Sequence, residues 1–265
     1  MGTTATATKP VGDLLREWRQ RRRLSQLDFA NDAEISTRHL SFLETGRSQP
    51  SRDMILRLAE RLDIPLRERN LLLTAAGYAP IFPERKLDDP KLRSARAAVD
   101  IVLKGHEPLP ALAIDRHWTM IAANGSVKPL LTGVARELLE PPVNVLRLSL
   151  HPGGLSPRIE NLSEWRAHLF DRLRRQIELT ADPVLIQLLD ELRSYPVPLS
   201  AGPAQHADFA GVIVPLRLKT GEGTLSFFST TTVFGTPVDI TLSELAIESF
   251  FPADSETAEA LQKLA

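Results

Sequence analysis

Two short helical segments, separated by only two residues, are the feature of this chain that most constrains its fold. The first spans residues 25–33 and the second spans residues 36–44. Ala30 supplies a small side chain where the two helices would approach most closely, and Ser36 is a candidate N-cap for the second helix. A plain pair of antiparallel core helices would not need the small residue, the tight turn and the cap together. The pattern therefore predicts a helix-turn-helix that binds duplex DNA.

The motif lies inside a predicted five-helix domain of residues 11–77. Apolar residues recur at helical spacing over residues 11–22 and again after Ser51, which is a candidate cap for the fourth helix. Gly46 follows the motif's second helix, where a glycine commonly ends a helix. Pro65 suits the first turn of a fifth helix. We therefore expect this domain to be all-α.

The composition changes after residue 77. Residues 78–92 are charged and interrupted by prolines, which predicts a linker to a second domain of residues 93–265. Residues 1–10, rich in Thr and Ala, are expected to form a disordered tail. Helical and strand patterns alternate in the second domain, which indicates an α+β fold. Its expected helices cover residues 90–104, 163–179 and 182–192, and its expected strands cover residues 111–114, 118–123, 212–218, 225–233 and 244–251.

The formal charge of −1 is divided unevenly along the chain. Residues 1–80 carry 13 basic residues (Lys and Arg) and 10 acidic ones (Asp and Glu). Residues 81–265 carry 19 basic residues and 23 acidic ones. The basic excess lies with the predicted DNA-binding motif, although so small an excess would decide nothing alone.

Composition also excludes several classes of site. The chain has no cysteine, which rules out disulfide bonds, thiolate metal sites and cysteine nucleophiles. No apolar run approaches the ~18 residues that a bilayer-spanning helix needs. The first ten residues lack the hydrophobic stretch of a signal peptide. We therefore expect a cytoplasmic protein that does not contact a membrane.

The residues around the motif resemble the Xre family of phage-repressor-like helix-turn-helix regulators. The likeness rests on Leu24-Ser25-Gln26, Ile35-Ser36, residues 42–47 and Pro50-Ser51. It implies a lambda-repressor-like domain whose second motif helix lies in the major groove of DNA. The DNA-contacting residues that it implies are Gln26, Ser36, Thr37, Arg38, His39, Ser41, Phe42 and Arg47.

Thr37, Arg38 and Phe42 occupy base-facing positions in the family, and His39 and Ser41 could reach phosphates or bases nearby. Arg38 is the strongest candidate for reading a base, because a guanidinium pairs with both O6 and N7 of guanine, which is worth ~1–3 kcal/mol of discrimination. Phe42 has two open interpretations, since its ring could touch a thymine methyl group or could belong to the domain core. Gln26 and Arg47 are expected to contact phosphates.

Three further residues bear on the scaffold of the motif. Glu34 stands where the family usually has a glycine in a left-handed turn. A glutamate there either costs on the order of 1 kcal/mol or is accommodated by a turn of different geometry. Arg19 and Glu44 match a buried ion pair that the family uses to join its first and third helices. The resemblance therefore implies a structural role for this pair and no part in reading DNA.

The second domain has a resemblance of its own. Residues 113–124 resemble the opening hairpin of a PAS-like sensor. Together with the Xre-type domain and the linker sequence Gly77-Tyr78-Ala79-Pro80, this hairpin is similar to the MmyB-like regulators. The likeness implies a PAS-like ligand-binding domain, with a fatty acid or another small apolar molecule as effector. We expect no metal and no resident cofactor, and haem bound through a histidine is the less favoured alternative.

A curved sheet covered by helices would leave an apolar cavity, the usual form of a small-molecule site. The residues expected to form that site are Trp118, Asn124, Trp165, Phe170 and Phe227, with Phe209, Phe228 and Phe234 as further candidate wall residues. A carboxylate ligand would also need a polar partner, for which Arg116, His117, Asn124 and His206 remain open. The helix at residues 163–179 has a charged face, which is assigned to solvent in preference to a phosphate-binding patch. Its residues are Arg166, Arg172, Arg174, Arg175 and Glu178.

An enzyme and a docking domain are the competing interpretations. No catalytic residues are expected, because the histidines show no metal-ligand repeat and no Gly-x-Ser-x-Gly elbow is present. The alternative to ligand sensing is a constitutive repressor whose second domain serves dimerisation or protein docking. In the favoured interpretation a homodimer binds a near-palindromic operator and a small effector changes the arrangement of its two DNA-binding heads.

Overall fold

The computed structural model describes residues 9–264, apart from 197–212, 222, 236 and 238. The chain divides into two compact units, one made mainly of the residues up to Glu84 and the other mainly of those from Arg85 onward. This division falls inside the segment of residues 78–92. Among the described helices, none has both the length and the apolar composition needed to cross a bilayer.

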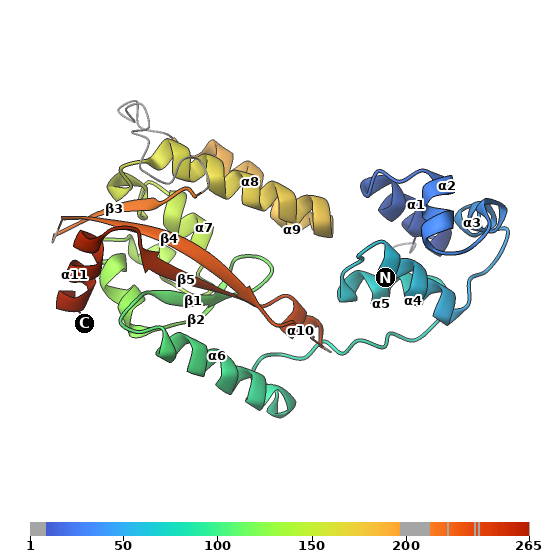
Figure 1. Ribbon diagram of the computed structural model, residues 1–265, viewed down its shortest axis with the longest axis horizontal. Coiled ribbons are helices and arrows are strands. Elements are labelled where there is room, and N and C mark those ends of the chain that lie inside the picture. Colours follow the sequence, from blue (N-terminus) through green and yellow to red (C-terminus); the bar gives the residue numbers. More distant parts are fainter. Residues whose placement is uncertain (1–8, 197–212, 222, 236, 238, 265) are drawn as a thin grey trace, which may run out of the picture. The chain divides into compact units, whose positions relative to one another are not determined.

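The described residues of the first unit form a domain of five helices, as the sequence predicts (Figure 1). Fully buried residues at helical spacing, such as Leu15, Phe29, Leu40 and Leu58, form its core. The helices are α1 (Val11–Arg21), α2 (Gln26–Asp32), α3 (Thr37–Glu44), α4 (Arg52–Arg61) and α5 (Leu66–Ala75).

Serine side chains begin three of these helices. The predicted caps Ser36 and Ser51 accept hydrogen bonds from the backbone N–H groups of His39 and Met54, at 3.1 and 3.2 Å. Ser25 caps α2 in the same way, which the sequence analysis did not identify. Each cap satisfies one of the backbone donors that a helix start leaves unpaired.

The segment after α5 is held by the side chain of Asn70. Its Oδ1 accepts hydrogen bonds from the backbone N–H groups of Ile81 and Phe82, and its Nδ2 donates to the carbonyl of Phe82. The Tyr78 hydroxyl also donates to the carbonyl of Pro50 at 3.2 Å. The first residues of the expected linker are thus part of the helical domain.

The second unit contains an antiparallel sheet whose described strands run in the order β2-β1-β5-β4-β3. Helix α6 lies on one side of it, and α7, α8 and α9 lie on the other (Figure 1). The strands are β1 (Ala111–Ile114), β2 (Met120–Ala123), β3 (Leu216–Thr220), β4 (Gly223–Val233) and β5 (Ala246–Pro252). The helices are α6 (Arg93–Gly105), α7 (Val145–Leu150), α8 (Leu162–Thr180), α9 (Pro183–Ser194), α10 (Ile240–Ser243) and α11 (Ser255–Leu264), with 3₁₀ turns at Pro90–Leu92, Gly125–Leu131, Arg136–Leu138 and Ser156–Arg158.

Alternation along β1 explains why this strand is buried on both faces. Ala111 and Ala113 pack with α6, whereas Leu112 and Ile114 point into the larger core beneath α7 and α8. The same alternation along β5 sends Ile247 toward α6 and Glu248 toward the larger core. The sheet is therefore covered on both faces, and its larger core lies on the α7–α8 side.

Four of the five predicted strands differ in their bounds. The strands expected at residues 225–233 and 244–251 are found at Gly223–Val233 and Ala246–Pro252. The strand expected at residues 118–123 begins only at Met120, because Trp118 has a φ of +65° and lies in the turn. The strand expected at residues 212–218 is found at Leu216–Thr220, and residue 212 lies outside the described residues. The short helix α7 was not predicted.

The closest approach of α1 and α3 occurs at Gly12. A Cβ atom at this position would lie 2.3 Å from the carbonyl oxygen of Leu43 and 2.9 Å from that of Glu44. We expect Gly12→Ala to lower the free energy of unfolding of the helical domain by about 1–3 kcal/mol, because backbone atoms must move apart. Thermal unfolding followed by circular dichroism measures this. Gln20→Ala, on the exposed face of the same helix, is the control, and equal stability of the two variants would contradict the prediction.

Candidate functional site

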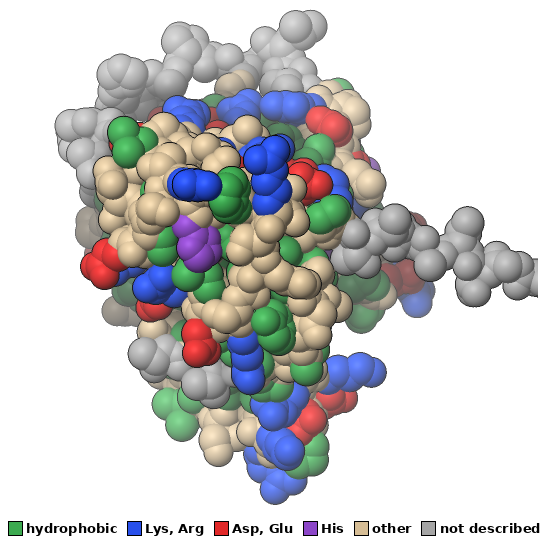
Figure 2. All heavy atoms as spheres, turned by 90° about the vertical axis from the view of Figure 1, so that its right-hand side faces the viewer, with side chains coloured by type: hydrophobic (Ala, Val, Ile, Leu, Met, Phe, Trp, Pro, Cys, Tyr) green, Lys and Arg blue, Asp and Glu red, His purple; other side chains and the backbone are tan. Residues whose placement is uncertain are grey.

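Helix α3 separates its side chains into two faces. Leu40, Leu43 and Glu44 are buried against the domain core. Of the predicted DNA-contacting residues, Ser36, Arg38, His39 and Arg47 are exposed, and Gln26, Thr37, Ser41 and Phe42 are half-buried. In the view of Figure 2, basic side chains are spread among uncharged and acidic ones. The face suits contacts to both bases and phosphates, as expected of a helix placed in a groove.

Phe42 lies at the surface between two arginines. The guanidinium of Arg38 lies 5.3 Å from its ring centroid and that of Arg47 lies 5.9 Å away. The ring is not among the residues of the buried core. Of the two interpretations of Phe42, the core aromatic is therefore wrong. The ring instead orients two cations on the surface that would face DNA, through contacts worth roughly 0.5–1 kcal/mol each at exposed sites.

The buried ion pair implied by the resemblance is present. Arg19 on α1 donates from Nε and Nη2 to the two carboxylate oxygens of Glu44 on α3, at 2.6 and 2.9 Å. Arg16 adds a hydrogen bond of 2.8 Å to the Glu44 carbonyl. Since Glu44 is only 1% exposed, the pair fixes α3 to α1 in the one orientation that neutralises the buried charge.

Gln26 belongs to the same network. Its Nε2 donates to the Glu44 carboxylate at 2.8 Å, so its amide nitrogen is engaged within the protein. Burial would raise the pKa of Glu44, but hydrogen bonds from Arg19 and Gln26 and the positive charges of Arg19 and Arg16 outweigh it, so the pKa is lowered. The predicted phosphate contact of Gln26 stays a prediction.

The turn between α2 and α3 has the left-handed residue that the family pattern suggests. Glu34 adopts a φ of +56°. The N–H of Ile35 donates to the carbonyl of Ala30 at 2.9 Å, and the N–H of Glu34 donates to the carbonyl of Asn31 at 3.1 Å. These are the two hydrogen bonds of a Schellman motif, in which glycine is the usual left-handed residue. The turn keeps this geometry with glutamate in place of glycine, at the energetic cost of a left-handed backbone conformation at Glu34.

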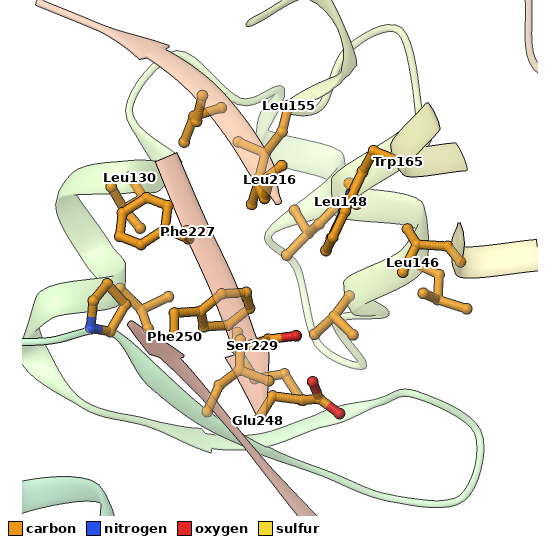
Figure 3. Close-up of a pocket in the computed structure, with 18 of the residues that line it drawn as sticks. Leu130, Leu146, Leu148, Leu155, Trp165, Leu216, Phe227, Ser229, Glu248 and Phe250 are labelled. Carbon is orange, nitrogen blue, oxygen red and sulfur yellow. The ribbon is translucent and has the colours of Figure 1, made fainter. Parts of the chain in front are cut away.

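A cavity of about 100 Å³ lies between the sheet and helices α7 and α8. Leucines and aromatic rings form most of its wall, and the oxygens of Ser229 and Glu248 lie together at the end opposite Leu155 and Leu216 (Figure 3). Its described lining residues are Pro110, Leu112, Trp118, Met120, Val127, Leu130, Leu131, Val145, Leu146, Leu148, Ser149, Leu155, Trp165, Leu169, Arg172, Leu216, Leu218, Phe227, Ser229, Glu248 and Phe250.

Three of the five residues expected at the ligand site line this cavity, namely Trp118, Trp165 and Phe227. Both indole nitrogens are engaged. Trp118 donates to Oε1 of Gln176 at 2.7 Å, and Trp165 donates to the hydroxyl of Ser149 at 2.9 Å. The two rings are therefore held in fixed orientations and present apolar surface to the cavity.

Asn124 and Phe170 do not line the cavity. The Asn124 amide accepts from the N–H of Ala111 and donates to the carbonyls of Leu103 and Leu109, so it holds the start of β1. Phe170 follows Leu169 on α8 and points roughly 100° away from it, with its ring beneath the Arg166 guanidinium at 5.0 Å. The expectation that these two residues contact a ligand is not met by their positions.

The other candidates are also placed elsewhere. His117 hydrogen-bonds to Asp182 at 2.9 Å, and Arg116 lies 3.4 Å from the same carboxylate. Phe228 stacks on Phe251 and Phe234 packs beside the cluster under α6. Phe209 and His206 lie outside the described residues.

The polar end of the cavity contains a residue that the sequence analysis assigned to solvent. Arg172 follows Trp165 by seven residues and Leu169 by three, so it lies on the same face of α8 and lines the cavity. The assignment of Arg172 to a solvated face was therefore wrong. Its spacing from Trp165 was the signal that could have placed it.

Arg172 forms an ion pair with Glu248 on β5. Its Nη2 donates to Oε1 at 2.5 Å and its Nη1 to Oε2 at 3.2 Å. The Thr231 hydroxyl accepts from Arg172 at 3.0 Å and donates to Glu248 at 2.8 Å, and Thr231 is the residue opposite Glu248 on β4. The guanidinium also lies over the Trp118 ring at 4.9 Å. The cavity thus ends in a paired and hydrogen-bonded charge.

We expect Glu44→Ala to lower the free energy of unfolding by roughly 3–5 kcal/mol, because Arg19 would keep a buried charge without a partner. Chemical denaturation measures the loss. Glu17→Ala, which breaks the exposed Lys9–Glu17 pair at 2.7 Å, is the matched control and should cost at most about 1 kcal/mol. An unchanged melting temperature for Glu44→Ala would contradict the structural role.

The same pair predicts a pH dependence. Since folding lowers the pKa of Glu44 below its ordinary value of 4.5, the carboxylate stabilises the fold above that pH. This stabilisation is lost as the pH falls through the lower pKa of the folded state. The stability difference between the parent chain and Glu44→Gln should therefore shrink as unfolding is measured at decreasing pH, and a constant difference would contradict the assignment.

Comparisons with known proteins agree with the two-domain architecture. The family model described as "MmyB-like transcription regulator ligand binding domain" matches residues 95–264, and the model described as "Helix-turn-helix domain" matches residues 10–72. A protein of Methanoculleus marisnigri, named as a candidate HTH-type transcriptional regulatory protein, is 35% identical over 122 residues. That alignment covers 44% of this chain and 39% of the relative, so the chain matches well under half of the relative's length.

A solved structure, titled "Structure of an RNA-binding Light-Oxygen-Voltage Receptor", aligns with 98% of this chain and 65% of its own at 11% identity. Its TM-score of 0.26 is too low to support a statement about the fold. The family assignment rests instead on the first model, which covers more than half of the chain. The chain therefore belongs to the MmyB-like transcription regulator family, with a helix-turn-helix domain preceding its ligand-binding domain.

Proposed function

We propose that this transcription regulator binds a specific duplex DNA site through α3, and that a compact, largely apolar effector in the cavity changes that binding. The observation that carries the proposal is the cavity itself, which is apolar along most of its wall and polar at one end. Such a lining is typical of small-molecule sites. It favours ligand sensing over a domain that serves only for docking.

For DNA reading, we propose that Arg38 pairs with a guanine in the major groove while Phe42 packs beside it. Arg38 is exposed and is held over the Phe42 ring, so its guanidinium is partly oriented before DNA binds. Arg47, on the other side of the ring, would contact phosphate. A homodimer on a near-palindromic operator, with half-sites about 34 Å apart, is the arrangement expected of such motifs.

The size of the cavity limits the effector. An engineered apolar cavity of about 150 Å³ accepts benzene, and the cavity here is about 100 Å³. A group smaller than benzene would fit the cavity as it stands, and a benzene-sized group would need a slight enlargement. The acyl chain of a fatty acid, the ligand that the family resemblance implies, would need a much larger one. The PAS-like fold that we propose for the domain is supported by the antiparallel sheet with helices over the cavity. We propose no catalytic step for this cavity.

An effector would regulate DNA binding only through its different affinity for two arrangements of the protein. Both Trp118 and Arg172 line the cavity, and they connect the β1–β2 turn with α8. A ligand that moves either side chain would change the packing between the sheet and its covering helix. We propose that this change alters the spacing of the two DNA-binding heads in a dimer.

We expect Arg38→Ala to weaken binding to the cognate operator by about 1–3 kcal/mol and to relax the preference at one base pair. The operator would first be selected from random duplexes with the full chain, and affinities would then be measured by fluorescence anisotropy at fixed salt. Arg61→Ala removes the same charge from the exposed end of α4 and is the control. An equal loss of operator affinity in the two variants would contradict direct base reading by Arg38.

We expect native mass spectrometry of the purified chain, followed by solvent extraction, to reveal a small apolar molecule bound in a stoichiometric amount. Adding this molecule back to the stripped protein should change its operator affinity. A protein that never carries a ligand, and whose DNA affinity no small molecule changes, would instead support a constitutive repressor with a docking domain.

A further inference from the structure

The charge at the polar end of the cavity is already balanced. Arg172 uses two hydrogen bonds for Glu248 and a third for Thr231, and one face of its guanidinium is covered by Trp118. These two residues carry the formal charges among the described residues of the lining. A ligand entering the cavity therefore meets a neutral pair and no cation that lacks a counter-charge.

Glu248 retains capacity to accept a hydrogen bond. An ionised carboxylate accepts about four hydrogen bonds. In this structure Oε1 accepts from Arg172 and Thr231, while Oε2 accepts from Arg172. Oε2 thus has one acceptor position left, in a side chain that is 5% exposed. A donor carried by the ligand would use it.

Ser229 lies beside this position and adds a second polar group. Strand alternation places Leu225, Phe227, Ser229 and Thr231 on the same face of β4, and the Ser229 oxygen lies near the Glu248 carboxylate in the cavity (Figure 3). The Ser229 hydroxyl makes no hydrogen bond to another described side chain. It could accept from or donate to the same polar group of a ligand.

We infer that the cavity selects a compact apolar molecule carrying a neutral hydrogen-bond donor, such as an alcohol or amide, and disfavours a carboxylate. This inference rests on the proposed function. A carboxylate would leave water and come next to the buried Glu248 anion, with Arg172 already neutralised. A hydroxyl or amide costs far less to desolvate and can donate to Glu248 Oε2. The pair thereby sets the class of effector.

The test uses four probes of similar shape, namely toluene, benzyl alcohol, benzamide and benzoate. Each is titrated into the full chain at pH 7, by calorimetry and by the fluorescence of the two cavity tryptophans. We expect benzyl alcohol and benzamide to bind at least about tenfold more tightly than benzoate. Benzoate binding as tight as the alcohol would overturn this inference alone. Failure of all four probes to bind saturably would overturn it together with the proposed effector site.

A specificity change provides a sharper comparison. Glu248→Gln frees the positive charge of Arg172 with little change in shape, so benzoate should gain affinity relative to benzyl alcohol. The matched control is Glu191→Gln, since Glu191 forms a similar two-bond pair with Arg147, at 2.7 Å for each bond, away from the cavity lining. In the control, the ratio of benzoate affinity to benzyl alcohol affinity should equal that of the parent chain. The same ratio in Glu248→Gln as in the parent chain would contradict the inference.

A double variant covers the case in which Glu248→Gln does not fold. Arg172→Met combined with Glu248→Leu removes both charges, and such replacement of a buried pair is often neutral or stabilising. This variant should lose most of the preference for benzyl alcohol over toluene, because only the weaker acceptor Ser229 is left for the alcohol hydroxyl. A retained preference for the alcohol would assign its recognition to another group and overturn the role of Glu248.

Discussion

A carboxylate removed from water must be paired, and both domains of this regulator are organised around that requirement. Glu44 in the helical domain is 1% exposed and Glu248 in the sheet domain is 4% exposed. Each receives two hydrogen bonds from an arginine of another element, Arg19 in the first case and Arg172 in the second. An incorrectly docked helix would leave a buried charge without a partner, so these pairs favour a single arrangement of each domain.

The two pairs differ in what surrounds them. Glu44 is enclosed by Arg19, Arg16 and Gln26, and it acts through the position of α3 without facing DNA itself. Glu248 forms part of a cavity wall, and we propose that its remaining acceptor position serves a ligand there. The same chemistry fixes a scaffold in one domain and, in our proposal, selects a ligand in the other.

Local sequence patterns were sufficient for most of the helical domain. The caps Ser36 and Ser51 and the apolar spacing are determined by neighbours within a few residues, so the sequence predicted them without tertiary information. The Ser25 cap was missed, and the sequence left the geometry of the turn at Glu34 open. The family resemblance supplied the Arg19–Glu44 pair. In the second domain the hairpin and the long helix α8 were found for the same reason, although the ends of the strands shifted by several residues.

The sequence by itself determined most of the helices and strands, though not α7, and also that α3 presents Arg38 and that the second domain is α+β. Only the tertiary structure decided which side chains face one another across elements. It placed Phe42 between two arginines and committed Asn124 to the backbone around β1. It also brought Arg172 to Glu248, 76 residues further along the chain. Periodicity gives the face of a helix or strand, but the partner of that face depends on how distant elements pack, which no local pattern encodes.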